Sequence, residues 1–295
     1  MKAAPFEYSR PADIAEACAI LGADEGARLI AGGQTLVPLM AMRLARPTRL
    51  VDIGRIAALS FVREVDSTIA VGATTRHAMV ERHPLVKARL PLLAKVVPWI
   101  GHAAIRARGT VGGSLANADP AAEISLVAVT LDAILTARDA AGETEIAAAD
   151  FFLGPMITAL PIAACLAAVR FPVWDDDRIG VGFHEVSARR SDFAFASAAT
   201  QLALDADGVC RRLAIGIGAV TDCPIRLRRA EQELAGIHLT PSSIRSAIDG
   251  AIAEVETASD LHASADYRRR AAATLATRAI IEANAVANGQ AAHAH

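Results

Sequence analysis

The fold of this chain is decided by the stretch Ile100-Gly-His-Ala-Ala-Ile-Arg-Ala-Arg-Gly109-Thr-Val-Gly112-Gly113-Ser-Leu-Ala-Asn-Ala-Asp119-Pro-Ala-Ala-Glu123. It places a Gly-Gly pair, small hydroxyls, an amide and two carboxylates between apolar segments. Because glycine has no Cβ, the backbone N–H groups of such a pair can approach an anion closely. Thr110 and Ser114 can add hydroxyl donors, and Asn117 and Glu123 can bind the neutral, hydrogen-bonding parts of the same molecule. This combination favours a site for a polar, phosphorylated ligand over a simple turn.

A second Gly-Gly pair occurs in Leu29-Ile-Ala-Gly32-Gly33-Gln-Thr-Leu36 and also follows an apolar run. With 20 glycines in 295 residues, the two pairs taken singly are also compatible with two unrelated turns. Their shared context is an apolar, strand-like run before the pair and small hydroxyl or amide residues after it, which favours one ligand held at both. Neither stretch contains G-x-G-x-x-G or G-x-x-x-x-G-K-[ST], so neither a Rossmann nor a P-loop scaffold is predicted.

The composition is that of a globular chain, and its 295 residues suggest two or three domains. Hydrophobic residues make up 53% and aromatic residues only 4%, which is enough for a core built largely from aliphatic side chains. The formal net charge of −2 provides no basic surface, so we expect no nucleic-acid partner. No uninterrupted apolar run reaches the length of about 18 residues, so we expect no membrane-spanning segment.

The four cysteines, Cys18, Cys165, Cys210 and Cys223, are far apart and form no C-x-x-C pair. Their spacing fits no iron–sulfur cluster motif, and we expect reduced structural thiols in a cytoplasmic protein. The first residues lack the apolar segment of an export signal, which agrees with a cytoplasmic location. We expect no metal site in this chain.

Start, stop and turn signals predict an α+β chain in three segments, 1–56, 57–176 and 177–295. The charged, proline-containing link 171–178 is the basis for the second boundary. Strands are predicted at residues 6–8, 28–31, 49–53, 59–64, 68–72, 133–138, 143–147, 163–171, 179–186, 200–204 and 211–217. Helices are predicted at residues 13–21, after Pro38, from Thr74 or Thr75 to Val80, after His83, and at 124–131, 241–252 and 267–284.

Three further predictions concern the last segment. Ser191-Asp192 can cap a helix or turn that holds Phe193 and Phe195. The basic run Arg268–Arg270 is either a solvated helix face or a surface for an acidic partner. Residues 285–295 are small and polar, and we expect about the last ten residues to be frayed.

Several motifs in this order resemble the FAD-binding medium subunit of the molybdenum hydroxylases, the family that includes carbon monoxide dehydrogenase and xanthine dehydrogenase. The resemblance extends over nearly the whole chain, and five separate motifs agree. The motifs are Ala31-Gly-Gly-Gln-Thr-Leu-Val-Pro38, Arg46-Pro with Leu50-Val-Asp-Ile53, Ile100-Gly-His with Arg108-Gly-Thr-Val-Gly-Gly-Ser114, Ala118-Asp-Pro-Ala-Ala-Glu123, and Arg189-Arg-Ser-Asp-Phe-Ala194. Pro224-Ile-Arg226 and His262-Ala-Ser-Ala-Asp-Tyr-Arg-Arg269 are also similar.

The resemblance implies a p-cresol methylhydroxylase-type FAD-binding fold in two subdomains, 1–56 and 57–176, followed by a C-terminal domain as in the carbon monoxide dehydrogenase flavoprotein. It implies that both Gly-Gly loops hold the FAD pyrophosphate. The implied cofactor-binding residues are Ala31, Gly32, Gly33, Gln34, Thr35, Leu36, Gly101, Thr110, Val111, Gly112, Gly113, Ser114, Asn117, Asp119, Glu123 and Phe193. Of these, Asn117, Asp119 and Glu123 are expected near the ribityl chain or the adenosine.

Four positions have a second interpretation or depart from the family pattern. Phe193 falls where the family places an apolar or aromatic residue over the isoalloxazine, and a plain core phenylalanine is its second interpretation. Arg28 stands where relatives often have lysine, which makes a phosphate-facing role an open alternative. Thr35 replaces the more usual serine and keeps the hydroxyl. For His102 we favour a role in anchoring the backbone or facing a partner over that of a catalytic base.

The implied function is that of an electron-transfer subunit with no catalytic residue of its own. The resemblance implies electrons that start at a molybdenum cofactor in a large subunit and cross [2Fe–2S] clusters in a small subunit. They then reach FAD in this chain and leave to an external acceptor, in a dimer of heterotrimers. Two alternatives stay open: a stand-alone FAD-dependent oxidase or reductase of the same fold, and an assembly protein that has lost FAD.

Overall fold

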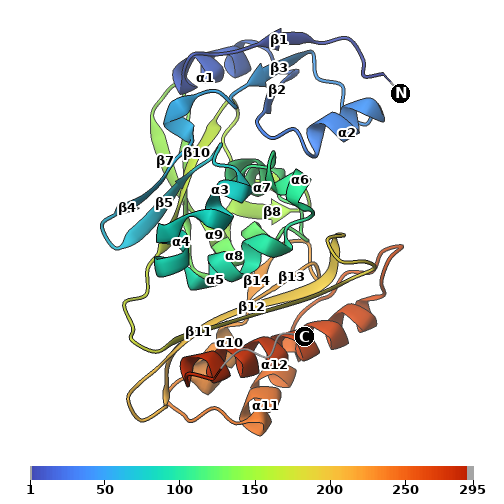
Figure 1. Cartoon of the computed structure of the whole chain (residues 1–295). Helices are drawn as coiled ribbons and strands as arrows, with labels where there is room; N and C mark the ends of the chain where they lie inside the picture. Colours follow the sequence, from blue (N-terminus) through green and yellow to red (C-terminus); the bar gives the residue numbers. More distant parts are fainter. Residues whose placement is uncertain (1, 291–295) are drawn as a thin grey trace.

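The computed structural model describes residues 2–290, which form three tiers that follow one another along the chain (Figure 1). A three-stranded, a five-stranded and a four-stranded sheet each organise one tier, and a two-stranded hairpin lies beside the middle one. The strands of the three sheets come from residues 7–52, 62–172 and 179–226. The α+β class predicted from the sequence is confirmed, while the exact boundaries at residues 56 and 176 stay predictions.

The first tier is a parallel β1-β3-β2 sheet with two helices. Its elements are β1 (Glu7–Ser9), α1 (Ile14–Ala23), β2 (Ala27–Ile30), α2 (Leu36–Ala41) and β3 (Arg49–Asp52). Helix α1 begins where the sequence predicts, because the Asp13 carboxylate accepts a hydrogen bond of 2.9 Å from the Glu16 N–H and so caps the first turn. The small core under this sheet includes Cys18 and is completed by Cys165 and Ala167 of the middle tier.

The middle tier is an antiparallel sheet in the order β4-β5-β10-β6-β7, covered by short helices. Its strands are β4 (Val62–Val65), β5 (Thr68–Gly72), β6 (Ile134–Arg138), β7 (Glu143–Ala147) and β10 (Cys165–Pro172), with β8 (Phe152–Gly154) and β9 (Ile157–Thr158) as the separate hairpin. Its helices are α3 (His77–Arg82), α4 (Pro84–Arg89), α5 (Pro91–Val96), α6 (Ala103–Arg106), α7 (Val111–Asn117), α8 (Glu123–Thr130) and α9 (Ala148–Phe151). Two 3₁₀ turns, η1 (Ala57–Leu59) and η2 (Val97–Trp99), complete it.

One predicted helix start in this tier is wrong. Neither Thr74 nor Thr75 caps α3, which begins two residues later at His77 with Arg76 before it and no side-chain cap. The Thr75 hydroxyl instead bonds the backbone of Phe61, accepting from its N–H at 3.0 Å and donating to its carbonyl at 2.9 Å. Thr75 therefore joins two segments that are distant in sequence, a use of the hydroxyl that competes with capping.

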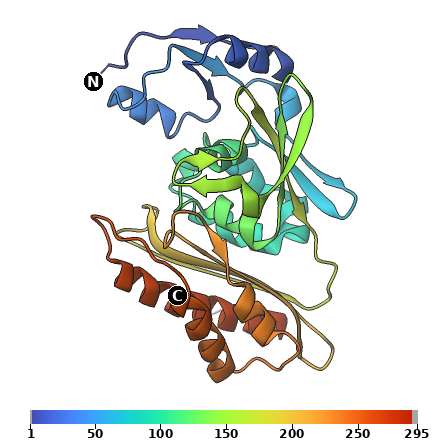
Figure 2. The same cartoon turned by 180° about the vertical axis from the view of Figure 1, so that it is seen from behind.

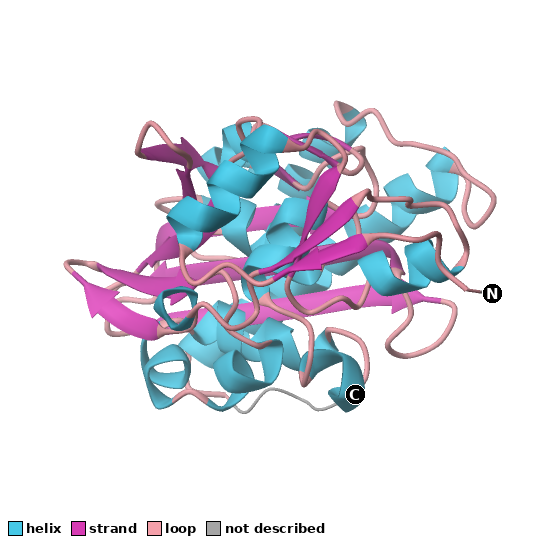
Figure 3. Cartoon of the chain, turned by 90° about the horizontal axis from the view of Figure 1, so that it is seen from above, coloured by secondary structure: helices cyan, strands magenta, loops and turns pink. Residues whose placement is uncertain are grey.

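The last tier is an antiparallel meander that is covered on one face by the chain's longest helices. Its elements are β11 (Ile179–Ser187), β12 (Ala194–Leu204), β13 (Cys210–Gly218), β14 (Ile225–Arg226), α10 (Arg228–Leu234), α11 (Pro241–Ala253) and α12 (Ala265–Ala287). Seen from behind, α11 and α12 lie on the outer side of the sheet (Figure 2). Seen from above, the long strands run across most of the molecule (Figure 3). Glycine lets α12 approach closely, since a Cβ at Gly182 would lie 2.7 Å from the carbonyl carbon of Ala279.

Three predictions for this tier need correction. Strand β12 begins at Ala194 rather than Thr200, so Phe195 is part of a strand and not of a helix or turn. Arg268 is only 7% exposed and donates to the carbonyls of Phe195 and Ala219, so the basic run is not simply a solvated face. Helix α12 continues to Ala287, three residues into the predicted frayed tail, whose residues 291–295 lie outside the described part of the chain.

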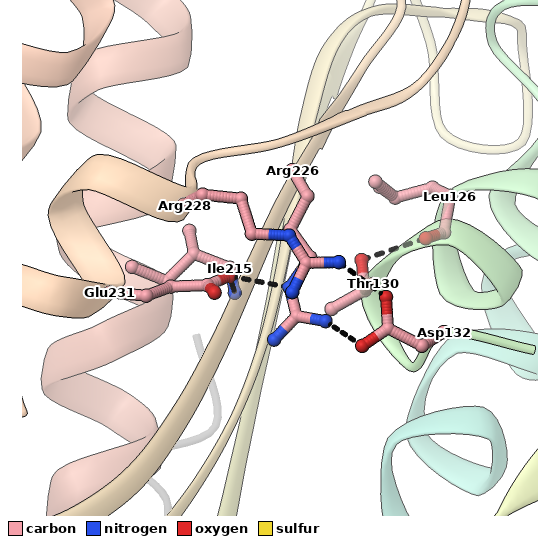
Figure 4. Close-up of polar contacts among 7 residues, drawn as sticks. All are labelled: Leu126, Thr130, Asp132, Ile215, Arg226, Arg228 and Glu231. Carbon is pink, nitrogen blue, oxygen red and sulfur yellow. Dashed lines mark hydrogen bonds and ion pairs between the residues drawn. The ribbon is translucent and has the colours of Figure 1, made fainter. Parts of the chain in front are cut away.

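The middle and last tiers are joined by close packing and by a charged cluster (Figure 4). Helix α8 packs on β13, and a Cβ at Gly216 would lie 2.8 Å from Leu126 Cδ1. At the edge of this contact, Arg226 donates to Asp132 and, at 2.7 Å, to Glu231. Glu231 also accepts a 2.7 Å hydrogen bond from the N–H of Ile215. The face of the last sheet opposite α12 is thereby held against the middle tier.

Within residues 2–290, no helix has both the length and the apolarity that a membrane crossing requires.

Candidate functional site

A cavity of about 670 Å³ lies where the three tiers meet, a size typical of small-molecule and cofactor sites. Every residue of the predicted cofactor-binding set lines it except Val111, although these residues come from segments as distant as 31–36 and 193. Val111 is buried in the core of the middle tier, and its N–H donates to the carbonyl of Thr75 at 3.0 Å. The structure therefore brings the predicted set together and shows that Val111 supports the cavity from behind.

The first Gly-Gly loop presents backbone donors to the cavity. Gly33 has φ +69°, a conformation that favours glycine. Within the described chain, the N–H groups of Gly33, Gln34 and Thr35 make no hydrogen bond to another protein group. A row of free N–H groups lining a concave surface is a ready anion site.

The same loop is pressed against the second one. A Cβ at Gly32 would lie 2.5 Å from the carbonyl oxygen of Arg108 and 2.9 Å from Gly109 Cα. The side-chain amide of Gln34 donates to the Gly32 carbonyl at 3.1 Å, which fixes the turn from within. The two Gly-Gly stretches thus meet at one point of the cavity wall, as the hypothesis of one ligand held at both requires.

The second Gly-Gly pair does not offer its N–H groups in the way the sequence suggested. Both glycines lie in the first turn of α7, where the Gly112 N–H donates to the Ala73 carbonyl at 2.8 Å. The Gly113 N–H donates to Thr110 Oγ1 at 3.1 Å, so Thr110 is the helix cap. Glycine is needed here for space, because a Cβ at Gly112 would lie 2.7 Å from Ala73 Cα. The donors left for a ligand on this side are the hydroxyl hydrogens of Thr110 and Ser114.

A third wall is the turn at Gly101, which has φ +46° and lies before α6. Its conformation is held by Arg106, which donates to the Gly101 carbonyl at 2.9 Å and forms an ion pair of 2.9 Å with Glu81. His102 is exposed at the rim of the cavity, and none of the described residues forms a hydrogen bond with its side chain. Arg106 rather than His102 therefore anchors this part of the backbone.

Carboxyl groups form the wall beyond α7. Burial, followed by the charge of Asp119, raises the pKa of Glu123 to about 7, and burial also raises the pKa of Asp119. Glu185 on β11, which the sequence analysis missed, does not line the cavity, but burial and the charge of nearby Glu123 raise its pKa to about 8. Near neutral pH a carboxyl with such a pKa carries a proton part of the time, so it both donates and accepts hydrogen bonds. This suits the hydroxyl and amide groups of a neutral ligand part.

Phe193 comes from the last tier and completes the cavity. Its side chain is 73% exposed, so the alternative of a core phenylalanine is wrong. It follows Ser191, which has φ +71°, and Asp192, which pairs with Arg189 at 3.0 Å. An exposed aromatic ring at the edge of a cavity is suited to cover a planar ligand.

Two further basic residues line the cavity. One nitrogen of Arg28 donates to the carbonyls of Glu25 and Ala27 at 2.9 and 2.8 Å, so its guanidinium is largely held by the first tier. His77 is almost completely buried, both ring nitrogens included, and burial lowers its pKa to about 4 although a backbone hydrogen bond with Thr110 acts in the opposite direction. No sequence motif singled out His77, because its position in the cavity depends on how α3 packs against Gly109.

These features fit FAD. The free N–H groups at 33–35 and the hydroxyls of Thr110 and Ser114 suit a pyrophosphate, and the partly protonated carboxyls suit ribityl and adenosine groups. The close approach at Gly32 leaves no room for a Cβ between the two loops.

Comparison with known families gives two matches that together span most of the chain. The family described as "FAD binding domain in molybdopterin dehydrogenase" matches residues 4–174. The family described as "CO dehydrogenase flavoprotein C-terminal domain" matches residues 182–283.

Individual proteins are similar over nearly their whole length. The alpha subunit of the 6-hydroxypseudooxynicotine dehydrogenase complex of Paenarthrobacter nicotinovorans is 37% identical over 285 residues, 96% of each chain. A chain of quinoline 2-oxidoreductase from Pseudomonas putida 86 superposes with a TM-score of 0.92 at 34% identity, covering 97% of this chain and 99% of that one. A chain of carbon monoxide dehydrogenase from Hydrogenophaga pseudoflava gives a TM-score of 0.93 at 33% identity, with the same coverage. The fold expected from the motifs is therefore confirmed.

Proposed function

Because this chain belongs to the FAD-binding medium subunits of the molybdenum hydroxylases, we propose that it passes electrons from the iron–sulfur clusters of a small subunit to an external acceptor. FAD is its cofactor, and as a subunit of an oxidoreductase it leaves substrate oxidation to the molybdenum subunit. The observation that carries the proposal is a single cavity in which free backbone donors, hydroxyls, partly protonated carboxyls and an exposed aromatic ring converge.

In this proposal, different parts of FAD are held by residues of different chemical type. The N–H groups of Gly33, Gln34 and Thr35 and the hydroxyls of Thr110 and Ser114 donate to the pyrophosphate, whose oxygens only accept. Asn117 and the carboxyls that follow it are assigned to the ribityl chain and the adenosine. The remaining residues of the predicted set, Ala31, Gly32, Leu36, Gly101, Gly112 and Gly113, shape the wall.

FAD, when bound, supplies the redox chemistry, since it accepts and releases electrons one or two at a time. The protein binds the cofactor, orients it and limits its access to water. Phe193, which belongs to the last tier, limits the access of water. In our assignment its exposed ring covers the isoalloxazine. No residue of the cavity is assigned a catalytic role.

The assembly we propose contains a large subunit with the molybdenum cofactor and a small subunit with [2Fe–2S] clusters. By their names the relatives are subunits of larger enzymes, among them the medium chain of carbon monoxide dehydrogenase from Hydrogenophaga pseudoflava. For the assembly we propose a dimer of heterotrimers in the cytoplasm.

The test is to purify the full chain, record its absorbance spectrum, identify the released chromophore, and isolate the chain from its host with its partners. We expect a yellow protein that releases FAD and carries molybdenum and iron–sulfur subunits with it. A yellow chain that stays alone and oxidises a small substrate would favour the stand-alone oxidase or reductase. A chain that neither carries nor takes up FAD would contradict the proposal.

A further inference from the structure

A second cavity, of about 400 Å³, adjoins the cavity assigned to FAD, and most of its lining residues belong to the last tier. Its size is within the range typical of small-molecule sites. The two cavities share four lining residues, Asp119, Ala121, Asp192 and Phe193. Phe193, whose side chain is 73% exposed, therefore borders both the space assigned to the cofactor and a neighbouring space that the cofactor assignment does not use.

Three of the sequence motifs that resemble the family meet at the second cavity. They belong to the segments 118–123, 189–194 and 262–269, of which the first lies in the middle tier and the other two in the last. The turn before β12 and the connection before α12 lie at the same end of the last tier in Figure 2. The assignment of FAD uses residues of the first two segments and none of the third. The third segment is thus available for a second ligand.

The walls of the second cavity are rich in rings for a chain with only 4% aromatic residues. Phe193 and Phe195 both line it, and the imidazole of His262 is nearly parallel to the Phe195 ring, at an angle of 13° with the centroids 6.2 Å apart. The backbone of His262 is held by the Asp260 carboxylate, which accepts a hydrogen bond of 2.8 Å from its N–H. Phe193 and His262 are exposed, so a ligand can reach them. Such rings offer flat faces on which a planar molecule stacks.

The charged groups that line the second cavity are paired or buried. Arg268 is 7% exposed, and its guanidinium donates to two backbone carbonyls and, at 2.6 Å, to the Asp260 carboxylate. Asp192 forms an ion pair of 3.0 Å with Arg189. Burial raises the pKa of Asp119 and so disfavours its charged form. Balanced charge and aromatic walls favour an uncharged planar ring over a phosphate or another anion.

We propose that the second cavity binds the external electron acceptor, and that this acceptor is an uncharged planar ring of the quinone class. The inference depends on the proposed function, since it places the acceptor on the side of Phe193 opposite the isoalloxazine of FAD. Phe195 and His262 supply the faces on which the ring stacks. In the transfer, the quinone gains the two electrons and two protons that FADH₂ loses in becoming FAD, and it leaves as a hydroquinone.

The experiment measures the binding of menadione, an uncharged quinone, and of NAD⁺ to the full-length chain loaded with FAD. Calorimetry gives the dissociation constants with oxidised FAD, and stopped-flow reoxidation of the photoreduced flavin gives a second value from the saturation of the rate. We expect menadione to bind and to reoxidise the flavin with saturation, and NAD⁺ to do neither. Binding and reoxidation by NAD⁺ instead of menadione would overturn the class of acceptor. A rate that never saturates, without calorimetric binding, would overturn the site.

Two variants at exposed positions test where the quinone binds. Ala188 lines the second cavity and not the first, so Ala188→Trp should weaken menadione by at least about tenfold and leave FAD affinity unchanged. His262→Leu removes one of the two parallel rings and should weaken menadione by about three- to tenfold. Ala206→Trp is the matched control, because Ala206 is exposed and lines neither cavity.

The failure of this inference is distinguishable from that of the proposed function. Unchanged menadione affinity in Ala188→Trp and His262→Leu would overturn the second cavity as the acceptor site and leave FAD binding standing. Displacement of menadione by FAD from the apo chain would also overturn it, because the quinone would then occupy the first cavity. If circular dichroism shows that one variant does not fold, the other still decides. A wild-type chain that binds no FAD would instead remove the proposed function itself.

Discussion

The two Gly-Gly stretches look alike in sequence, yet the structure uses them in opposite ways. At Gly32-Gly33 the backbone turns through a positive φ and the following N–H groups are left without protein partners. At Gly112-Gly113 the backbone is helical and the N–H groups bond to Ala73 and Thr110. The first pair therefore provides donors, and the second provides room. A glycine pair beside a ligand site is thus not by itself evidence that its own N–H groups bind the ligand.

The largest effect expected from this contrast is in Gly112→Val. The side chain would collide with Ala73, including its backbone, inside the core of the middle tier. We expect a loss of about 3 kcal/mol or more in the free energy of unfolding, with FAD binding lost as a consequence of misfolding. Urea denaturation of the purified chain measures it. Unchanged stability with lost FAD would show that the second pair binds the ligand directly after all.

Gly33→Val should reduce FAD affinity more than it reduces stability, the reverse of what we expect for Gly112→Val. The change forces a β-branched residue into a positive φ, which costs about 1–3 kcal/mol locally, and it disturbs the free N–H groups. We expect FAD affinity to fall by about 100-fold, or 2.7 kcal/mol, with a smaller loss of stability than in the Gly112 variant.

The matched control for Gly33→Val is Gly236→Val, because Gly236 has φ +79°, does not line the cavity and has open space around it. The control should lose stability and keep its FAD affinity. A similar loss of FAD in both variants would mean that strain, and not the loop donors, explains the effect.

Thr35 of the first Gly-Gly stretch and Thr110 of the second test the same difference between the two stretches. Thr110 caps α7 through Gly113, whereas Thr35 precedes α2 without a side-chain cap bond. Thr110→Val should therefore lose about 1 kcal/mol of stability as well as FAD affinity. Thr35→Val keeps the N–H but removes a hydroxyl from the lining of the cavity, so it should weaken FAD by about tenfold and leave the melting temperature within a degree or so. Thermal melting of the apo protein and FAD titration of both variants give the comparison, and equal melting temperatures for the two would contradict it.

The smallest expected effect concerns the carboxyls beyond the second pair. Burial raises the pKa of Glu123 to about 7 and that of Glu185 to about 8, above the ordinary value of 4.5. The folded state thus holds protons that the unfolded state releases, so this contribution to stability is complete below about pH 4.5 and is lost as pH rises through 7 and 8. Between pH 6 and 8.5, the melting temperature of the Glu185→Gln variant should fall by a few degrees less than that of the wild type.

The control for the pH experiment is Glu256→Gln, which changes an exposed carboxylate that does not line the cavity. Its melting temperature should follow that of the wild type at each pH. If Glu185→Gln also follows the wild type, the pKa of Glu185 is not raised, and the partial protonation assigned to Glu123 beside it loses its support.

Much of the fold could be predicted because its signals are local. Asp13 caps α1 through a residue three positions on, and Thr240 with Ser243 forms the capping box of α11. The strand–helix alternation of the first tier and the hairpin signals of the other two likewise need only neighbouring residues. Where a prediction failed, as at Thr75 and Arg268, the side chain bonds a backbone group 14 or more positions away.

The residues of the site likewise fall into two groups, those that short sequence patterns predict and those that only the packing of distant segments brings in. The sequence by itself determined the two glycine loops, the hydroxyl and carboxyl residues after them, and through the family motifs the cofactor, because these are short patterns of residue type. Only the tertiary structure decided that the Gly112 N–H bonds to Ala73, that His77 lines the cavity and that Glu185 lies close enough to Glu123 to share its electrostatics. The physical reason is that a hydrogen-bond partner, a desolvated carboxyl or a buried imidazole is defined by which distant segments pack together. That packing brings three separate tiers to one cavity.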